Sequence, residues 1–250
     1  MYRKAGQNMQ KIILEIQGKD INIHKASRFH GWLMEQVDEA YALRLHTEPL
    51  RPFSQYLYGN GEKWEWHIHT LTSEADEKIG NLILQKKEIL LESSNTPIRI
   101  LEKKWEEESI DDLLKKTYFT DSPDICTVEF LTPTSFKRQG KYLIFPDVKL
   151  IFQSLLQKFA ACDYEVSFGD GDILAEIQNK VEIIDYRLRT KKFYMEGTGI
   201  KGFQGNIRFK IYGSQAFINM VNFLLHFGGY AGIGIKTALG MGAAQISERR

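Results

Sequence analysis

Residues 53–69 read FSQYLYGNGEKWEWHIH, and this stretch predicts a β-hairpin. Aromatic residues fill both flanks, which favours strands, and the run Gly59-Asn60-Gly61 between them is typical of a tight turn. Working outward, residues 11–17 predict a strand, residues 25–45 a helix, and Ser73 the start of a second helix. Short strands are predicted at 88–91 and 98–101. The resulting order, β-α-β-β-α-β, is that of the ferredoxin-like fold.

The second half of the chain repeats this order. Strands are predicted at 126–131, 141–145, 181–193, 202–212 and 240–247, with helices at 148–159 and 214–227. Gly228-Gly229 is predicted to end the latter helix. The charged stretch 102–116 is interpreted as a solvated helix or linker, and Ser122-Pro123 as a turn. We therefore predict an α+β protein of two tandem ferredoxin-like (βαββαβ) domains, residues 1–122 and 123–250.

Composition excludes several classes of protein. Lys plus Arg total 33 and Asp plus Glu total 32 in 250 residues, so the chain as a whole lacks the charge of a basic nucleic-acid binder. Two cysteines exclude a disulfide scaffold and a four-cysteine zinc site. The polar N-terminus shows no signal peptide, and no run approaches the roughly 18 apolar residues of a membrane helix. A cytoplasmic protein that makes no membrane contact is expected.

Positive charge is concentrated locally. Residues 180–210 hold 8 basic and 3 acidic residues, whereas residues 62–116 hold 13 acidic and 9 basic. Alternation along two predicted strands puts the cations of each strand on one face. That face is either a solvated sheet surface or a platform for phosphates. The cations concerned are Arg187, Arg189 and Lys191 on one strand and Arg208 and Lys210 on the other. A third group, Lys137, Arg138 and Lys141, lies around Gly140 and is predicted to form a loop or a hairpin over the same ligand.

The segment 227–242, FGGYAGIGIKTALGMG, contains six glycines. A dinucleotide fingerprint needs a third glycine where Thr237 stands, and a phosphate-binding P-loop needs a glycine where Ile235 stands. A nucleotide-dependent enzyme is therefore disfavoured. What remains is a glycine-rich loop with one cation, Lys236, which serves either close packing of helix on sheet or close approach to a ligand.

This loop resembles the C-terminal signature of the CRISPR repeat-RNA processing endoribonucleases of the repeat-associated mysterious protein superfamily. The likeness extends to residues 26–46 (ASRFHGWLMEQVDEAYALRLH), 130–140 (FLTPTSFKRQG) and 142–157 (YLIFPDVKLIFQSLLQ), and is closest to stand-alone enzymes serving type III-A systems. It implies metal-independent cleavage of precursor CRISPR RNA within repeats, with no cofactor. In that reaction the 2′-hydroxyl attacks the adjacent phosphate and leaves 2′,3′-cyclic phosphate and 5′-hydroxyl ends. The protein is further expected to be a monomer or homodimer and to associate transiently with a type III interference complex.

The resemblance also implies roles for particular residues. Such a reaction needs a base, an acid and a cation. The resemblance places an acid–base histidine at His46, after the first helix, and a cation at Arg51; an exposed capping histidine is the alternative for His46. His30 assists or is a half-buried core histidine, and which of the two histidines is the base stays open. Tyr41 replaces a tyrosine that the family carries where Met34 stands, or is simply packed.

RNA binding is predicted for the basic residues and for the glycine-rich loop. His67 and His69 are interpreted as a solvent-facing or RNA-facing pair, and His226 as a favourable charge near the end of the last helix. Because non-cleaving members of the superfamily share the loop, a guide-RNA-binding subunit without catalysis is the alternative function. The predicted RNA-binding set is Lys137, Arg138, Lys141, Arg187, Arg189, Lys191, Arg208, Lys210, Gly232, Gly234, Lys236, Thr237, Gly240 and Gly242.

Overall fold

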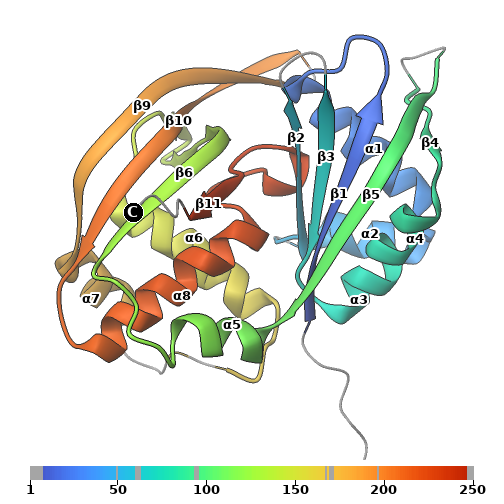
Figure 1. Ribbon diagram of the computed structural model, residues 1–250. Coiled ribbons are helices and arrows are strands. Elements are labelled where there is room, and N and C mark those ends of the chain that lie inside the picture. The colour runs from blue at the N-terminus through green and yellow to red at the C-terminus, as the bar shows by residue number, and fades with distance from the viewer. Residues whose placement is uncertain are drawn as a thin grey trace, which may run out of the picture.

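The computed structural model describes residues 8–48, 50–59, 63–92, 96–166, 168, 172–195 and 197–246. Two antiparallel sheets, each covered by helices, stand side by side (Figure 1). The fold is the predicted α+β arrangement of two tandem ferredoxin-like units. The predicted boundary between residues 122 and 123 stays a prediction.

The first unit is built on a five-stranded sheet in the order β2-β3-β1-β5-β4. The predicted hairpin is confirmed, because β2 and β3 pair from Phe53↔Thr70 to Gly59↔Trp64; residues 60–62 of its turn lie outside the described residues. The strands are β1 (Asn8–Gln17), β2 (Phe53–Gly59), β3 (Trp64–Thr70), β4 (Glu88–Ile89) and β5 (Ile98–Ser109). The helical elements are η1 (Ile23–Lys25), α1 (Ala26–Gln36), α2 (Glu39–Thr47), α3 (Ser73–Ala75), the π-helix η2 (Asp76–Gly80) and α4 (Asn81–Gln85).

The second unit has the strand order β11-β6-β10-β9, again antiparallel throughout. Its strands are β6 (Ile125–Thr134), β9 (Val181–Met195), β10 (Thr198–Ile211) and β11 (Ala244–Ile246). Its helical elements are α6 (Val148–Ala161), α7 (Ile173–Lys180), α8 (Gln215–Ala231) and η3 (Thr237–Leu239), and β7 (Phe136–Arg138) and β8 (Lys141–Leu143) form a separate hairpin. The helix α5 (Ile110–Thr117) precedes the predicted boundary but packs in the core of this second unit. The last strand is shorter than predicted, and Ser247 lies outside the described residues.

Three predicted elements are wrong in detail. The helix expected over 25–45 is two helices, because Val37 is extended and the Asp38 carboxylate caps α2 by accepting a hydrogen bond from the Tyr41 amide. The stretch 102–116 is the outer half of β5 followed by α5. Gly228-Gly229 does not end the last helix: α8 continues to Ala231, and Gly232 ends it at φ 66°.

The two units contact each other at several places, and two of them lie at opposite ends of the interface. Near the end of α8, the Tyr230 carbonyl accepts a hydrogen bond from Ser54 of β2 at 2.5 Å, and the Tyr230 ring lies 6.0 Å from that of His69 on β3. At the other end, the long ribbon of β9 and β10 arches over to the first unit (Figure 1). There the Tyr194 amide donates to Nδ1 of His24 at 3.1 Å, and Phe193 joins the first unit's core.

Candidate active site

A pocket of about 530 Å³ lies where the two units meet the glycine-rich loop. It is assembled from α1, the segment after α2, the hairpin β7–β8, α6 and the loop itself. Its size suits a ligand of roughly nucleotide dimensions. Lining side chains that can carry charge are His30, Arg51, Lys137, Lys158 and Lys236.

His30 is the histidine that lines this pocket. Burial, together with the positive charges of Arg51 and His46, lowers its pKa to about 4, although the Ala238 carbonyl favours the protonated form. The ring stacks on Phe53 with centroids 5.8 Å apart, and Nδ1 has no hydrogen-bond partner among the described residues. His30 is therefore neutral at neutral pH, which suits a proton acceptor.

His46 and Arg51 lie close to His30, as their influence on its charge requires. His46 is exposed on the last turn of α2, so its imidazole is open to an RNA ligand. Arg51 is half-buried, donates a hydrogen bond to the Glu48 carbonyl, and has its pKa lowered by burial. The structure thus brings together three of the four predicted catalytic residues.

Tyr41, the fourth, lies away from the pocket. Its side chain is buried in the first core, its hydroxyl has no partner among the described residues, and the charges nearest to it are those of Glu74 and Arg44. Burial raises its pKa. The break between α1 and α2 explains the difference, because a projection that treats 25–45 as one helix places Tyr41 beside His30. Packing is the role that the structure supports.

The hairpin β7–β8 carries the predicted basic group to the pocket's rim. Gln139 and Gly140 form its turn with positive φ, and Arg138 pairs with Lys141 across it. Lys137 lines the pocket, whereas Arg138 lies 3.6 Å from Asp147. A hairpin was one of the two predicted forms of this segment.

The glycines of the loop serve close packing. An added Cβ would lie 2.1 Å from the Ile233 carbonyl oxygen at Gly242 and 2.4 Å from the Ala26 side chain at Gly240. The amides of Gly232, Gly234 and Gly242 already donate to the Gly228 carbonyl, Ser154 Oγ and the Pro133 carbonyl. Contact between this loop and RNA stays a prediction, and Lys236 is the loop residue whose side chain can extend from the pocket wall.

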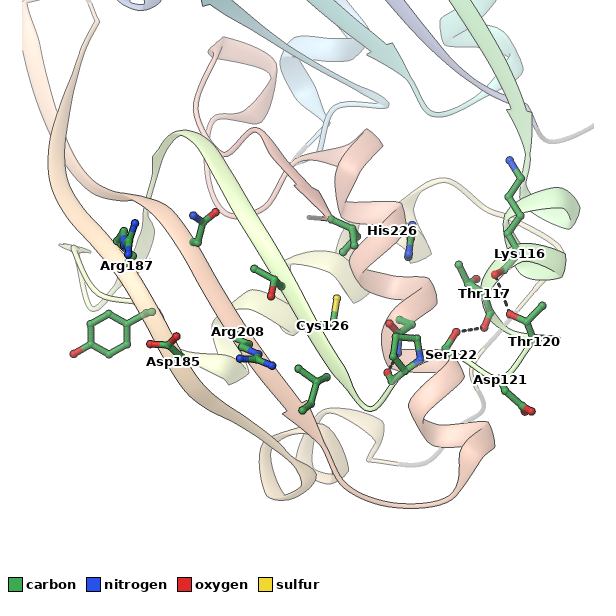
Figure 2. Close-up of a pocket in the computed structure, with 17 residues that line it drawn as sticks. Lys116, Thr117, Thr120, Asp121, Ser122, Cys126, Asp185, Arg187, Arg208 and His226 are labelled. Atoms are coloured by element: carbon green, nitrogen blue, oxygen red, sulfur yellow. Dashed lines mark hydrogen bonds between the residues drawn. The ribbon is translucent and has the colours of Figure 1, made fainter. Parts of the chain in front are cut away.

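The basic strands line a different surface. Arg187 and Arg208 border a hollow of about 940 Å³ that extends from the strands of the second sheet to α5 and α8, where His226 lines it (Figure 2). Arg187 also lines a smaller hollow, together with Arg189 and Tyr58. Neither hollow shares a lining residue with the pocket of His30. Lys210 forms an ion pair with Asp124, while Lys191 is exposed nearer the ribbon's tip.

His67 and His69 are not a solvent-facing pair. His69 is buried beneath Tyr230. Burial, and to a lesser extent the charges of Lys11 and His67, hold the pKa of His69 well below its usual range. His67 stacks on Tyr56 with ring centroids 4.5 Å apart, and its Nε2 is hydrogen-bonded to Glu65. Among the described residues, no group of three or more His, Cys, Asp or Glu side chains is arranged to hold a metal ion.

Two buried polar residues at the loop were missed from the sequence. Lys158 of α6 donates to the Gly232 carbonyl at 2.9 Å, and Gln55 of β2 donates to the Ala238 carbonyl at 3.0 Å. A lysine within the apolar face of the predicted helix 148–159 was a signal that could have identified the first. Gln55 shares the buried helix-facing side of β2 with Phe53 and Leu57, which makes its amide equally unusual.

Comparisons with known proteins assign this chain to a class of enzyme. Residues 128–244 match the family model described as CRISPR-associated endoribonuclease Cas6. A Streptococcus thermophilus protein of that description is 36% identical over 226 residues, covering 90% of this chain and 92% of its own length. One from Mycobacterium tuberculosis is 34% identical over 220 residues, covering 87% and 70%. The chain belongs to the Cas6 family.

Solved structures agree in fold. A Cas6 product complex superposes with a TM-score of 0.82 at 22% identity, covering 96% of this chain and all of the other. Thermus thermophilus Cas6 gives 0.75 at 23% identity, covering 97% and 100%. The described helices include none that is long and apolar enough to cross a bilayer.

Proposed function

We propose that this protein cleaves precursor CRISPR RNA within its repeats by metal-independent transesterification. The ribose 2′-oxygen attacks the adjacent phosphorus, its proton passes to a base, and the bond to the 5′-oxygen breaks as an acid protonates that oxygen. The products are 2′,3′-cyclic phosphate and 5′-hydroxyl ends. The observation that carries the proposal is the meeting of His30, Arg51, Lys137 and Lys236 in one pocket beside the exposed His46.

The residues divide the chemistry between them. His46 is the principal acid–base group because it is open to RNA, and it protonates the leaving 5′-oxygen. His30, held neutral by burial, can accept a proton and assists as the base. Arg51 lines the same pocket as His30 and offsets the extra negative charge on the phosphoryl group. Lys137 and Lys236 hold flanking phosphates at the pocket's rim.

The open face of the second sheet offers a further track for RNA. Arg187 and Arg189 are two residues apart on β9, so their side chains lie on one face at about 7 Å spacing. Tyr58 of β2 lies across the same hollow and offers a ring on which an unpaired base can stack. Repeat RNA that occupies the pocket of His30 would continue around the molecule to this face.

The test is cleavage of repeat RNA in excess EDTA, followed by chemical mapping of both ends. We expect cyclic phosphate and 5′-hydroxyl ends, no cleavage when the scissile ribose lacks its 2′-hydroxyl, and a fall of about 100-fold or more for His46→Ala with RNA affinity retained. Binding without any cleavage by the unmutated protein would instead establish the alternative, a guide-RNA-binding subunit.

Three broader expectations belong to the same proposal. The protein works in the cytoplasm, acts as a monomer or homodimer, and associates transiently with a type III interference complex. Light scattering on the free and RNA-bound protein distinguishes the two oligomeric states. Co-purification from cells with and without ribonuclease treatment tests whether the association with the interference complex depends on RNA.

A further inference from the structure

The glycine-rich loop is held from one side by a buried lysine. Lys158 is 6% exposed, and its ammonium donates to the Ala231 carbonyl at 3.2 Å, the Gly232 carbonyl at 2.9 Å and Thr237 Oγ1 at 3.1 Å. An ammonium has three protons, and these three acceptors use all of them. Two of the acceptors end α8, and the third begins the turn η3 in the loop.

The same loop is held from the other side by a buried amide. Gln55 is 1% exposed, and its Nε2 donates both to the Ala26 carbonyl of α1 at 2.9 Å and to the Ala238 carbonyl of η3 at 3.0 Å. Its Oε1 accepts from the Trp66 indole at 2.9 Å, which fixes the orientation of the amide. Gln55 therefore ties the first unit, including the helix that carries His30, to the loop of the second.

The two contacts meet at adjacent residues of one turn. Lys158 holds Thr237 and Gln55 holds Ala238, whose carbonyl is also the backbone group that faces His30. Lys236, at positive φ, precedes the turn and lines the pocket. A displacement of this turn would therefore move Lys236 and change the surroundings of His30 together.

A buried lysine without a carboxylate partner is costly to keep. Burial lowers the pKa of Lys158 to about 7, and the titratable side chain that opposes this shift is the Cys162 thiol rather than a carboxylate. An apolar side chain of similar length would fill the same space without desolvating a charge. The presence of Lys158 is thus better explained by the loop that it holds in place than by a contribution to the stability of the folded protein.

We propose that Lys158 and Gln55 are positioning residues for RNA cleavage. Together they clamp the turn Thr237–Leu239 between the two units and so set the place of the glycine-rich loop against His30. The Lys158 ammonium is used up by acceptors within the protein, and Gln55 does not line the pocket, so both act through the turn. The inference rests on the proposed function, since it assigns these residues to that reaction.

The test compares single-turnover cleavage at saturating repeat RNA with affinity for the same RNA lacking the scissile 2′-hydroxyl. We expect Lys158→Met and Gln55→Met each to lower the cleavage rate constant by roughly 10-fold to 100-fold, because small displacements of reacting groups have effects of that size. Affinity should stay within about threefold. Lys149→Met, the same change at an exposed position of α6, is the matched control and should cleave as the unmutated protein does.

The double variant Lys158→Met/Gln55→Met gives the sharper result. If both side chains act through one turn, the second change should add little to the first, so the combined loss will be well below the product of the two. Each protein is assayed well below its own unfolding temperature. Should Lys158→Met not fold, Thr237→Val removes one acceptor while keeping the side-chain shape and is expected to lose rate in the same way.

Any of three results would overturn the proposed role of Lys158 and Gln55. The single variants could cleave within twofold of the unmutated rate constant, they could lose only RNA affinity, or the two losses could multiply in the double variant. The proposed function fails separately, because it requires that the unmutated protein cleave the RNA at all.

Discussion

The acid sensitivity of this protein should depend measurably on His30. Burial and two neighbouring cationic groups lower its pKa to about 4 in the folded protein, against 6.5 for an ordinary histidine. Between these pH values the unfolded chain binds a proton that the folded protein does not. The unfolded state is therefore favoured as pH falls, and the stability associated with neutral His30 is complete above pH 6.5 and is lost towards pH 4.

The expected magnitude follows from the two pKa values. Lowering the pH from 7.5 to 4.5 should cost the folded state about 2.5 kcal/mol through His30 alone. Other buried histidines add to the total, His69 above all, so the comparison must be made between variants. We expect the free energy of unfolding of His30→Gln to fall by about 2.5 kcal/mol less than that of the unmutated protein over this pH range.

Urea denaturation at several pH values from 7.5 to 4.5 measures this difference. Arg51→Gln provides an independent check, since removing a positive charge beside His30 should raise its pKa and reduce the acid penalty without abolishing it. Parallel curves for the unmutated protein and His30→Gln would refute the reasoning. The pKa of His30 would then be about the same in the folded protein as in the unfolded chain, and burial could not be the reason that it is neutral.

Two further predictions concern the loop and the basic strands. In the same urea denaturation assay, Gly240→Ala should destabilise the protein by about 2–4 kcal/mol, because φ of Gly240 is 107° and the new Cβ would meet the Ala26 side chain. Gly197→Ala is the control. Gly197 also has positive φ but open space around it, so this change should cost only about 1 kcal/mol. Replacing Arg187 and Arg189 together by Gln should reduce the slope of log affinity for repeat RNA against log salt by about 1.4–1.8 if both contact phosphates, whereas an unchanged slope would remove this face from the RNA path.

The sequence was sufficient for the fold where local pattern and tertiary pairing agree. Alternation and turn residues identified β2, β3, β9 and β10, and the repeated order identified both ferredoxin-like units. It failed for β5, because residues 102–109 are mostly charged and become a strand only by pairing with β1. The break between α1 and α2 had a local signal in Asp38, a good capping residue, but the apolar spacing on both sides concealed it.

For the site, the sequence indicated which residues carry the chemistry better than it indicated where those residues lie. The resemblance identified His46, His30 and Arg51, which the fold brings together. Strand periodicity correctly placed Arg187, Arg189 and Arg208 on one face, yet it could not tell which surface that face would meet. The second sheet turns its open face away from the pocket of His30, so two surfaces that the sequence merged are separate in the structure.

Lys158 shows how a local pattern can point to a functional residue before a structure is known. Ile151, Phe152, Leu155 and Phe159 define the buried face of α6, and the lysine lies among them. A long side chain at the rim of such a face usually extends its charged end to water. Here three acceptors at the end of α8 and in the loop hold the ammonium inside instead. A buried charge that is satisfied by internal acceptors stabilises one arrangement of the surrounding backbone over others. The backbone that it holds here is the wall of the pocket that contains His30.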